Sequence, residues 1–235
     1  MTVPRNETSG RPTNDGGRSA SVPFPFALVA GSRPAQGAAG ASGHGRQRRQ
    51  LPYRRRRRIQ PTAKQPLSPP DLAHVRSHGP VAPINPQTYK LTIVNQQNKE
   101  TVLSLEQLKA LPDEKIMASV ICAAVRRKEL NALKQTKGFN TAVGGWHNGL
   151  FTGVPLHKLL KQCGVEMTPG KDQWVEFQGS ENLPEGLYET CIPLHKALDP
   201  ASDVLVAYEH NDEPLRHDHG HPMRIVVPGP WVADG

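Results

Sequence analysis

The residues with the clearest chemical potential are one cysteine and two arginines, Cys122, Arg126 and Arg127. Cys122 ends an apolar run of β-forming residues, 116–121, and the arginines follow four and five positions later. Fixed positive charge beside a thiol lowers its pKa and favours the thiolate, which is both a nucleophile and a soft metal ligand. The segment therefore indicates metal binding or nucleophilic chemistry. The alternative is a buried strand-end cysteine with arginines that face solvent.

Histidines and arginines gather in two further segments. Residues 74–78 place Arg76 between two histidines, which suits an anion, and residues 217–224 alternate three histidines along a short loop, with His210 upstream. Zinc sites usually take their ligands from preorganised positions on two elements. The loop therefore fits a phosphate or pterin-like ligand as well as zinc, and an unliganded surface loop remains an alternative. A nucleophilic pair of Cys122 and a histidine is also conceivable.

A glycine-rich stretch, 144–149, precedes an aromatic residue and could bring its backbone close to a ligand. It matches no phosphate-loop pattern.

Short alternating segments surround these residues. The sequence predicts strands over 89–94, 115–122, 173–177, 203–209 and 224–227, and helical segments over 104–111, 126–136, 155–163 and 193–198. Ser104 and Gln107 have the spacing of a capping box, and Gly164 fits the C-terminal stop of the third helix. Leu130 and Leu133 lie on the apolar side of the second helix, and 178–186 has the composition of a loop. Short strands mixed with short helices, without a regular βαβ repeat, predict an α+β domain.

The first 70 residues differ in composition from the rest. Residues 1–65 carry twelve arginines and one lysine against two acidic residues, while the whole chain is only +8, so residues 66–235 are net acidic. A segment rich in Gly, Pro, Ser and Arg cannot bury enough apolar area to order itself, so we expect a disordered leader over 1–70 and a domain over 71–235. The arginine run 54–58 either binds polyanions or is a solvated linker. The acidic remainder does not support a nucleic-acid-binding core.

Three distant cysteines do not make a disulfide framework, and a reducing compartment is the simpler assumption. No apolar stretch approaches the roughly 20 residues of a membrane span. The leader is Arg-rich and acid-poor, as transit peptides are, but its Gly and Pro residues oppose an amphipathic helix. Mitochondrion and cytosol are therefore both expected compartments.

Five segments, in order, resemble the molybdopterin-binding domain of the sulfite oxidase and assimilatory nitrate reductase family. Residues 74–81 (HVRSHGPV) resemble the family's V-R-N-H-x-P-V, and residues 121–130 (ICAAVRRKEL) resemble its C-A-G-N-R-R-x-E. Residues 138–140 and 151–156 are similar to the family's G-F-N and W-x-G-V-P-L. Residues 187–194 and 197–200 are similar to its Y-x-x-S-I-P-L and A-x-D-P. Residues 205–209, 218–224 and 228–229 are similar to its L-A-Y, D-H-G-x-P-x-R and P-G.

The resemblance implies a sulfite oxidase-like α+β fold of mixed sheets and short helices, and a molybdenum–molybdopterin cofactor. It implies that Cys122 ligates molybdenum, a role that suits a soft sulfur donor. Arg76 and Arg127 match arginines that contact the cofactor or an oxyanion substrate, and guanidinium forks suit both. The other cofactor-binding positions that it implies are His74, Ser77, His78, Glu181, His219 and Arg224.

The implied reaction is oxygen-atom transfer to sulfite, which gives sulfate and releases two electrons to an external acceptor. A nitrate reductase-type domain is the second interpretation, although no haem motif (H-P-G-G) or flavin domain is visible. A non-catalytic cofactor-binding fragment is the third. Ala124-Val125 stand where the family has Gly-Asn, which removes easy access to positive φ and a polar partner. After Pro228-Gly229 the family continues into a dimerisation domain, so the domain is expected to be incomplete at its C-terminal end.

Overall fold

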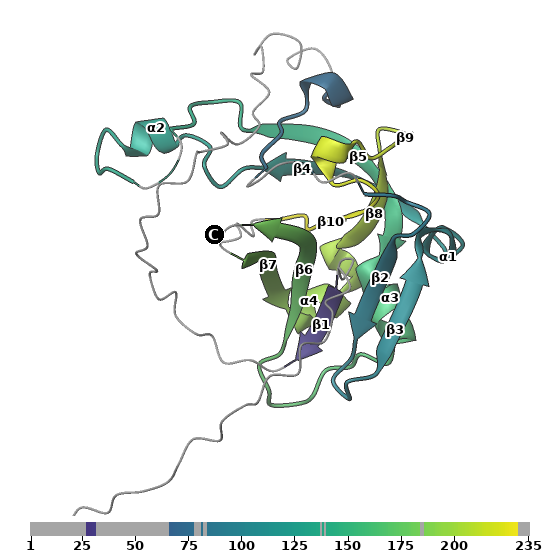
Figure 1. The fold of residues 1–235 in the computed structure, drawn as a ribbon. Helices are drawn as coiled ribbons and strands as arrows, with labels where there is room; N and C mark the ends of the chain where they lie inside the picture. The colour runs from purple at the N-terminus through teal and green to yellow at the C-terminus, as the bar shows by residue number, and fades with distance from the viewer. Residues whose placement is uncertain are drawn as a thin grey trace, which may run out of the picture.

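The computed structural model describes residues 27–31, 66–77, 81, 84–136, 138, 140–183 and 186–229, with only the backbone for 27–31 and 180–187. Within these ranges the chain forms two β-sheets with short helices between and around them (Figure 1). This arrangement is the predicted α+β class of mixed sheets and short helices. The longest helix described, α3, has seven residues, so none in this part of the chain could cross a membrane.

The first sheet has the strand order β3-β2-β1-β6-β7. Its strands are β1 (Ala27–Gly31), β2 (Lys90–Val94), β3 (Glu100–Ser104), β6 (Trp174–Leu183) and β7 (Gly186–Pro193). β1 pairs in parallel with β2 and antiparallel with β6, so it fills the space between them.

Ala27–Gly31 falls within the predicted leader, yet it pairs in the first sheet; the domain boundary at residue 70 stays a prediction. A five-residue apolar segment has too little local signal to mark a strand, and its pairing partners lie more than sixty residues away. The rest of residues 1–65, including the arginine run, lies outside the described residues.

The second sheet has the order β10-β8-β5-β4, and the two-residue β9 pairs with β8. Its strands are β4 (Glu114–Ile121), β5 (Trp146–Pro155), β8 (Leu205–His210), β9 (Glu213–Pro214) and β10 (Arg224–Val226). β5 is long: its first half pairs with β4 and its second half also with β8, with a register shift between Thr152 and Gly153. The strand curves from β4 toward α3 (Figure 1).

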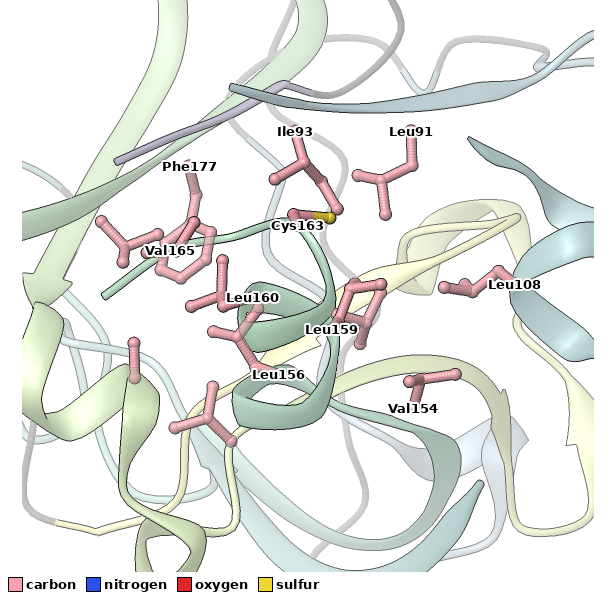
Figure 2. Close-up of a cluster of buried hydrophobic side chains, with 14 of the residues drawn as sticks. Leu91, Ile93, Leu108, Val154, Leu156, Leu159, Leu160, Cys163, Val165 and Phe177 are labelled. Atoms are coloured by element: carbon pink, nitrogen blue, oxygen red, sulfur yellow. The ribbon is translucent and has the colours of Figure 1, made fainter. Parts of the chain in front are cut away.

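The main core lies between the two sheets and is centred on α3 (Leu156–Gln162). Figure 2 shows Leu156, Leu159 and Leu160 among Leu91 and Ile93 of β2 and Phe177 of β6. The remaining helices are α1 (Leu105–Lys109), α2 (Arg127–Leu130) and α4 (Leu194–Leu198), with 3-10 turns η2 (Pro70–Leu72), η3 (Pro200–Ser202) and η4 (His217–His219). A smaller core of Ala118, Phe151, Leu205, Ala207 and Val226 covers one face of the second sheet.

Several local predictions are confirmed. The Ser104 hydroxyl accepts from the Gln107 amide, and the Gln107 side chain accepts from the Ser104 amide, which is the predicted capping box. Gly164 follows α3 with φ +73°, as a helix stop requires.

Three local predictions are wrong. The loop predicted over 178–186 is strand in its described part, since 178–183 belong to β6 and Gly186 begins β7, with a register shift between Gln178 and Asn182. Residues 146–149 of the glycine-rich stretch belong to β5. The helix predicted over 126–136 is limited to Arg127–Leu130, and the side that the pattern marked as apolar is exposed, with Leu130 at 56% and Leu133 at 90%.

Candidate cofactor site

Cys122 follows β4 directly and continues its pairing with β5, since its amide donates to the Gly145 carbonyl at 2.8 Å. Side chains alternate along a strand, so Cys122 falls on the same face as Ala118 and Val120. Its thiol is half-buried and accepts from the Ala124 amide at 3.4 Å. Among the described residues no histidine is hydrogen-bonded to it, so the structure offers no support for a Cys/His nucleophile pair.

The turn after Cys122 accommodates the residues that replace Gly-Asn. The positive φ of this turn, +60°, falls on Arg126 and not on Ala124 or Val125. Ala124 is buried, and the turn is closed by the Val125 amide, which donates to the Cys122 carbonyl at 2.9 Å. The expected backbone conflict at Ala124 is therefore absent.

The two arginines of this turn have different surroundings. Arg126 is exposed and pairs with Glu129 at 2.5 Å. Arg127 is half-buried, and its guanidinium lies over Gly138, where an added Cβ would come within 2.4 Å of Nη1. Arg127 forms no ion pair with any described residue, so its guanidinium can receive an oxyanion.

The segment 66–77 is attached to the second sheet and to the η4 turn. The Ser68 amide donates to the Asn148 carbonyl at 2.9 Å, and the Asn211 side chain donates to the Ser68 carbonyl at 2.9 Å. Arg216, just before η4, pairs with Asp71 at 2.5 Å. These contacts hold the predicted site segment 74–77 next to the histidine loop.

Within that segment, Arg76 is half-buried and donates through Nη1 to the Ser77 carbonyl at 2.6 Å. His74 is also half-buried. His78 and the side chain of Glu181 lie outside the description, and the Glu181 backbone belongs to β6 of the first sheet.

His219 and Arg224 form the best-defined part of the site. His219 is 4% exposed, and its Nδ1 lies 3.0 Å from an Asp218 carboxylate oxygen. The carboxylate accepts a hydrogen bond, which fixes the proton on Nδ1 and leaves Nε2 as a lone pair. Arg224 donates through Nη1 to the His219 carbonyl at 3.2 Å. Among the described residues, the His219 Nε2 and the Arg224 Nε are buried without a hydrogen-bond partner.

The charge of Arg224, beside His219, favours the binding of an anion. Arg224 forms no ion pair with a carboxylate in the described part of the chain, and burial lowers its pKa while nearby Tyr188 raises it slightly. Burial likewise lowers the pKa of His219, although Asp218 opposes the shift. A buried charge without a counter-ion is costly. The Arg224 guanidinium therefore fits an anionic group, such as the phosphate of a pterin cofactor, and the His219 Nε2 offers a polar contact to the pterin ring.

Two more buried histidines complete the cluster: His210, which the sequence suggested only as an addition to the histidine loop, and His147, which the sequence did not single out. The ring centroids of His147 and His210 lie 5.3 Å apart, and each lies 5.8 Å from His219. His210 stacks on Phe151 at 4.8 Å, its direct partner across β5 and β8. Burial lowers the pKa of His210 to about 4, with further lowering from His219, Arg224 and Arg216.

The geometry does not support the zinc alternative. No group of three or more His, Cys, Asp or Glu side chains in the described residues is placed to hold a metal ion. His217 and His221 pair with each other at 4.6 Å instead of joining His210.

The fold and these side chains define a two-sheet α+β domain with a cluster of histidines and an arginine that fits an anionic group. Residues 78–234 match the model of the oxidoreductase molybdopterin-binding domain, and the chain belongs to this family. The resemblance found in the sequence is therefore confirmed, and with it an oxidoreductase domain whose cofactor is molybdenum–molybdopterin.

Two curated relatives illustrate the range of the family. Mitochondrial sulfite oxidase of Drosophila melanogaster is 41% identical over 168 residues, which are 71% of this chain and 29% of that protein. The NADPH nitrate reductase of Phytophthora infestans is 40% identical over 166 residues, 69% of this chain and 18% of that protein. The chain thus spans less than a third of the length of these curated relatives.

A solved structure agrees in fold. The sulfane dehydrogenase SoxCD from Paracoccus pantotrophus superposes with a TM-score of 0.57 at 30% identity, covering 70% of this chain and 40% of that one.

Proposed function

We propose that this domain catalyses oxygen-atom transfer to sulfite, giving sulfate. The observation that carries the proposal is the half-buried Arg224 beside the buried His219: its guanidinium has no carboxylate partner in the described residues, and its Nε is buried without a hydrogen bond. The relative named sulfite oxidase supports sulfite as the substrate. A nitrate reductase-type reaction is the second candidate, because nitrate reductases are 36% to 40% identical to the chain.

Each predicted site residue has a role in this proposal. Cys122 ligates molybdenum through its thiolate, as the soft donor of the set. Arg76 and Arg127 bind the oxyanion through guanidinium forks, and Arg127 suits this role because it is half-buried and without an ion-pair partner among the described residues. The cofactor contacts are His74, Ser77, His78, Glu181, His219 and Arg224.

The residues of this chain bind the cofactor and the substrate, orient them and offset their negative charge. When bound, the cofactor supplies the transferable oxygen and accepts two electrons. Overall, sulfite and water give sulfate, two protons and two electrons, and the electrons pass to an external acceptor. Arg76 and Arg127 offset the charge of the sulfite dianion near an anionic cofactor, which otherwise repels it. His219 and Arg224 fix the cofactor at its polar end.

The test is to purify the full chain from a host that synthesises the cofactor, and to measure molybdenum, pterin and turnover. Sulfite-dependent reduction of an artificial acceptor supports the proposal, and nitrate-dependent oxidation of a reduced dye supports the second candidate. Cys122→Ala should lose activity, while Cys191→Ala, a change at an exposed cysteine, should not. A chain that carries neither molybdenum nor turnover contradicts both enzymatic candidates and leaves the non-catalytic fragment.

A matched pair of arginine variants tests substrate binding. Arg127→Gln should raise KM for sulfite more than tenfold, since charge-assisted hydrogen bonds contribute about 1.5–3 kcal/mol. Arg126→Gln is the control, because Arg126 is exposed and pairs with Glu129. Equal effects of the two changes would contradict the assignment of Arg127.

We further infer a mitochondrial or cytosolic location and a polyanion-binding leader. The printed name of the Drosophila relative supports the mitochondrion, and five consecutive arginines, 54–58, support polyanion binding. Cell fractionation tests the first. Retention on heparin, compared between the full chain and a variant with residues 54–58 changed to glutamine, tests the second.

A further inference from the structure

Two buried imidazoles, His210 and His219, lie near the half-buried Arg224, and this arrangement affects where a proton can bind. His210 and His219 are both at least 95% buried, and their rings lie 5.8 Å apart. The Nε2 atoms of both rings have no hydrogen-bond partner in the described part of the chain. The titratable and charged groups that face the two rings are His147, Asp218, Arg216 and Arg224, with Tyr188 beside Arg224.

We propose that this histidine pair takes up a proton when an anion binds at Arg224, so that anion binding and protonation are coupled. Under the proposed function the anion is the phosphate of the cofactor. Only the identity of the anion rests on the proposed function. The coupling between anion binding and protonation follows from the side chains of this chain.

Without an anion, a second positive charge is unfavourable here. The Asp218 carboxylate already holds one proton on Nδ1 of His219, so protonation means adding a proton to Nε2 in a site that contains the Arg224 cation. Burial and this cation lower the pKa of both histidines. Both rings are therefore neutral at neutral pH, and each disfavours charge on the other.

A bound dianion reverses the sign of this environment. An imidazolium at His219 would then lie between the Asp218 carboxylate and the anion, and opposite charges within about 4–6 Å favour the charged form. The pKa of the pair is higher with the anion than without it. Between the two values, anion affinity falls about tenfold for each unit rise in pH, because one proton must be bound for each anion.

The experiment uses the full chain purified without cofactor and inorganic sulfate as the probe, since sulfate stays fully ionised in this range. Calorimetric titrations in pairs of buffers with different ionisation enthalpies, from about pH 5.5 to about pH 7.5, count the protons taken up. We expect close to one proton per anion at a pH between the two pKa values, and an affinity that falls as pH rises. A pH-independent affinity, or no saturable binding, overturns the inference.

Variants assign the proton and the anion. His219→Gln should remove most of the proton uptake, whereas His217→Gln, on the same turn but exposed and paired with His221, should keep it. Arg224→Gln should abolish sulfate binding. Proton uptake that persists in both His219→Gln and His210→Phe contradicts the proposal. Sulfate binding that persists in Arg224→Gln also contradicts it. If a variant does not fold, the wild-type pH series still decides.

The outcome is separate from that of the proposed function. Proton-coupled sulfate binding by a chain that never acquires molybdenum would sink the enzymatic proposal alone. Molybdenum and sulfite turnover combined with pH-independent sulfate binding would sink only the coupling.

Discussion

Replacing Gly149 with alanine should destabilise the domain, because the histidine cluster occupies the space of the missing side chain. A Cβ at Gly149 would come within 2.4 Å of His210 Nε2, 2.6 Å of its Cδ2 and 2.9 Å of Phe151 Cε2. Ordinary carbon contacts are about 3.5–4.0 Å, so the rings would have to move by about 1 Å. Both rings are buried and stacked at 4.8 Å, so neither can swing aside freely.

The magnitude follows from overpacking of a buried site, which costs about 1–3 kcal/mol. Alanine also reduces the entropy of the unfolded chain, which gains about 0.4–1 kcal/mol relative to glycine. Gly179→Ala is the matched control, since an added Cβ there meets only Tyr188 at 3.5 Å or more. The entropic gain is shared, so the difference between the two variants isolates the overpacking at about 1–3 kcal/mol.

The assay is urea denaturation followed by tryptophan fluorescence, in the wild type and both variants. The double variant Gly149→Ala/His210→Ala should recover part of the loss seen when Gly149→Ala is made alone, since coupling between touching residues appears as non-additivity. If Gly149→Ala is as stable as Gly179→Ala, the packing of His210 over Gly149 is not as described.

Four further changes test other parts of the structure. Ser104→Ala should cost about 1 kcal/mol of unfolding free energy through loss of the capping box, measured in urea. Tyr208→Phe should cost about 0.5–1.5 kcal/mol, because it removes the hydroxyl that donates at 2.6 Å to the exposed Asp113 carboxylate, which water can then solvate; an unchanged denaturation midpoint would contradict this. Since the pKa of His210 is about 4 in the folded chain and about 6.5 when unfolded, the unfolded state binds the extra proton between these values. Stability should therefore be complete above about pH 6.5 and fall toward pH 4 by up to about 1.4 kcal/mol per pH unit, and His210→Phe should flatten this slope in thermal melts at a series of pH values. Arg224→Met should leave the cofactor-free chain as stable as the wild type or more stable, because a half-buried charge without a carboxylate partner in the described residues is removed. A loss of more than about 2 kcal/mol would show that Arg224 supports the fold without its ligand.

Local sequence signals predicted much of the fold. The capping box at Ser104, the glycine stop at Gly164 and the strands β2 and β4 each depend on neighbouring residues, and all are present, although β2 is buried on both faces at 91–93. β1 could not be predicted, because its pairing with β2 and β6 joins segments far apart in the chain.

The site was predictable only in part for the same reason. His219 and Arg224 lie in one short segment, so a motif identifies them. His147 and His210 join them only through the pairing of β5 with β8, which sets Phe151 opposite His210. Because residues 144–149 were predicted as a glycine-rich loop, His147 was not identified as a site residue. In the structure His147 is paired with Val120 across β4 and β5, which places its side chain on the inward face of the sheet.

The central claim is that Cys122 holds molybdenum in a cofactor site of this chain. X-ray absorption at the molybdenum edge, on the full chain loaded in a host that makes the cofactor, tests it most directly. Cys122→Ser should remove one sulfur scatterer from the metal, while Cys191→Ser, at an exposed cysteine, should leave the spectrum unchanged. An unchanged sulfur shell in Cys122→Ser would contradict the account.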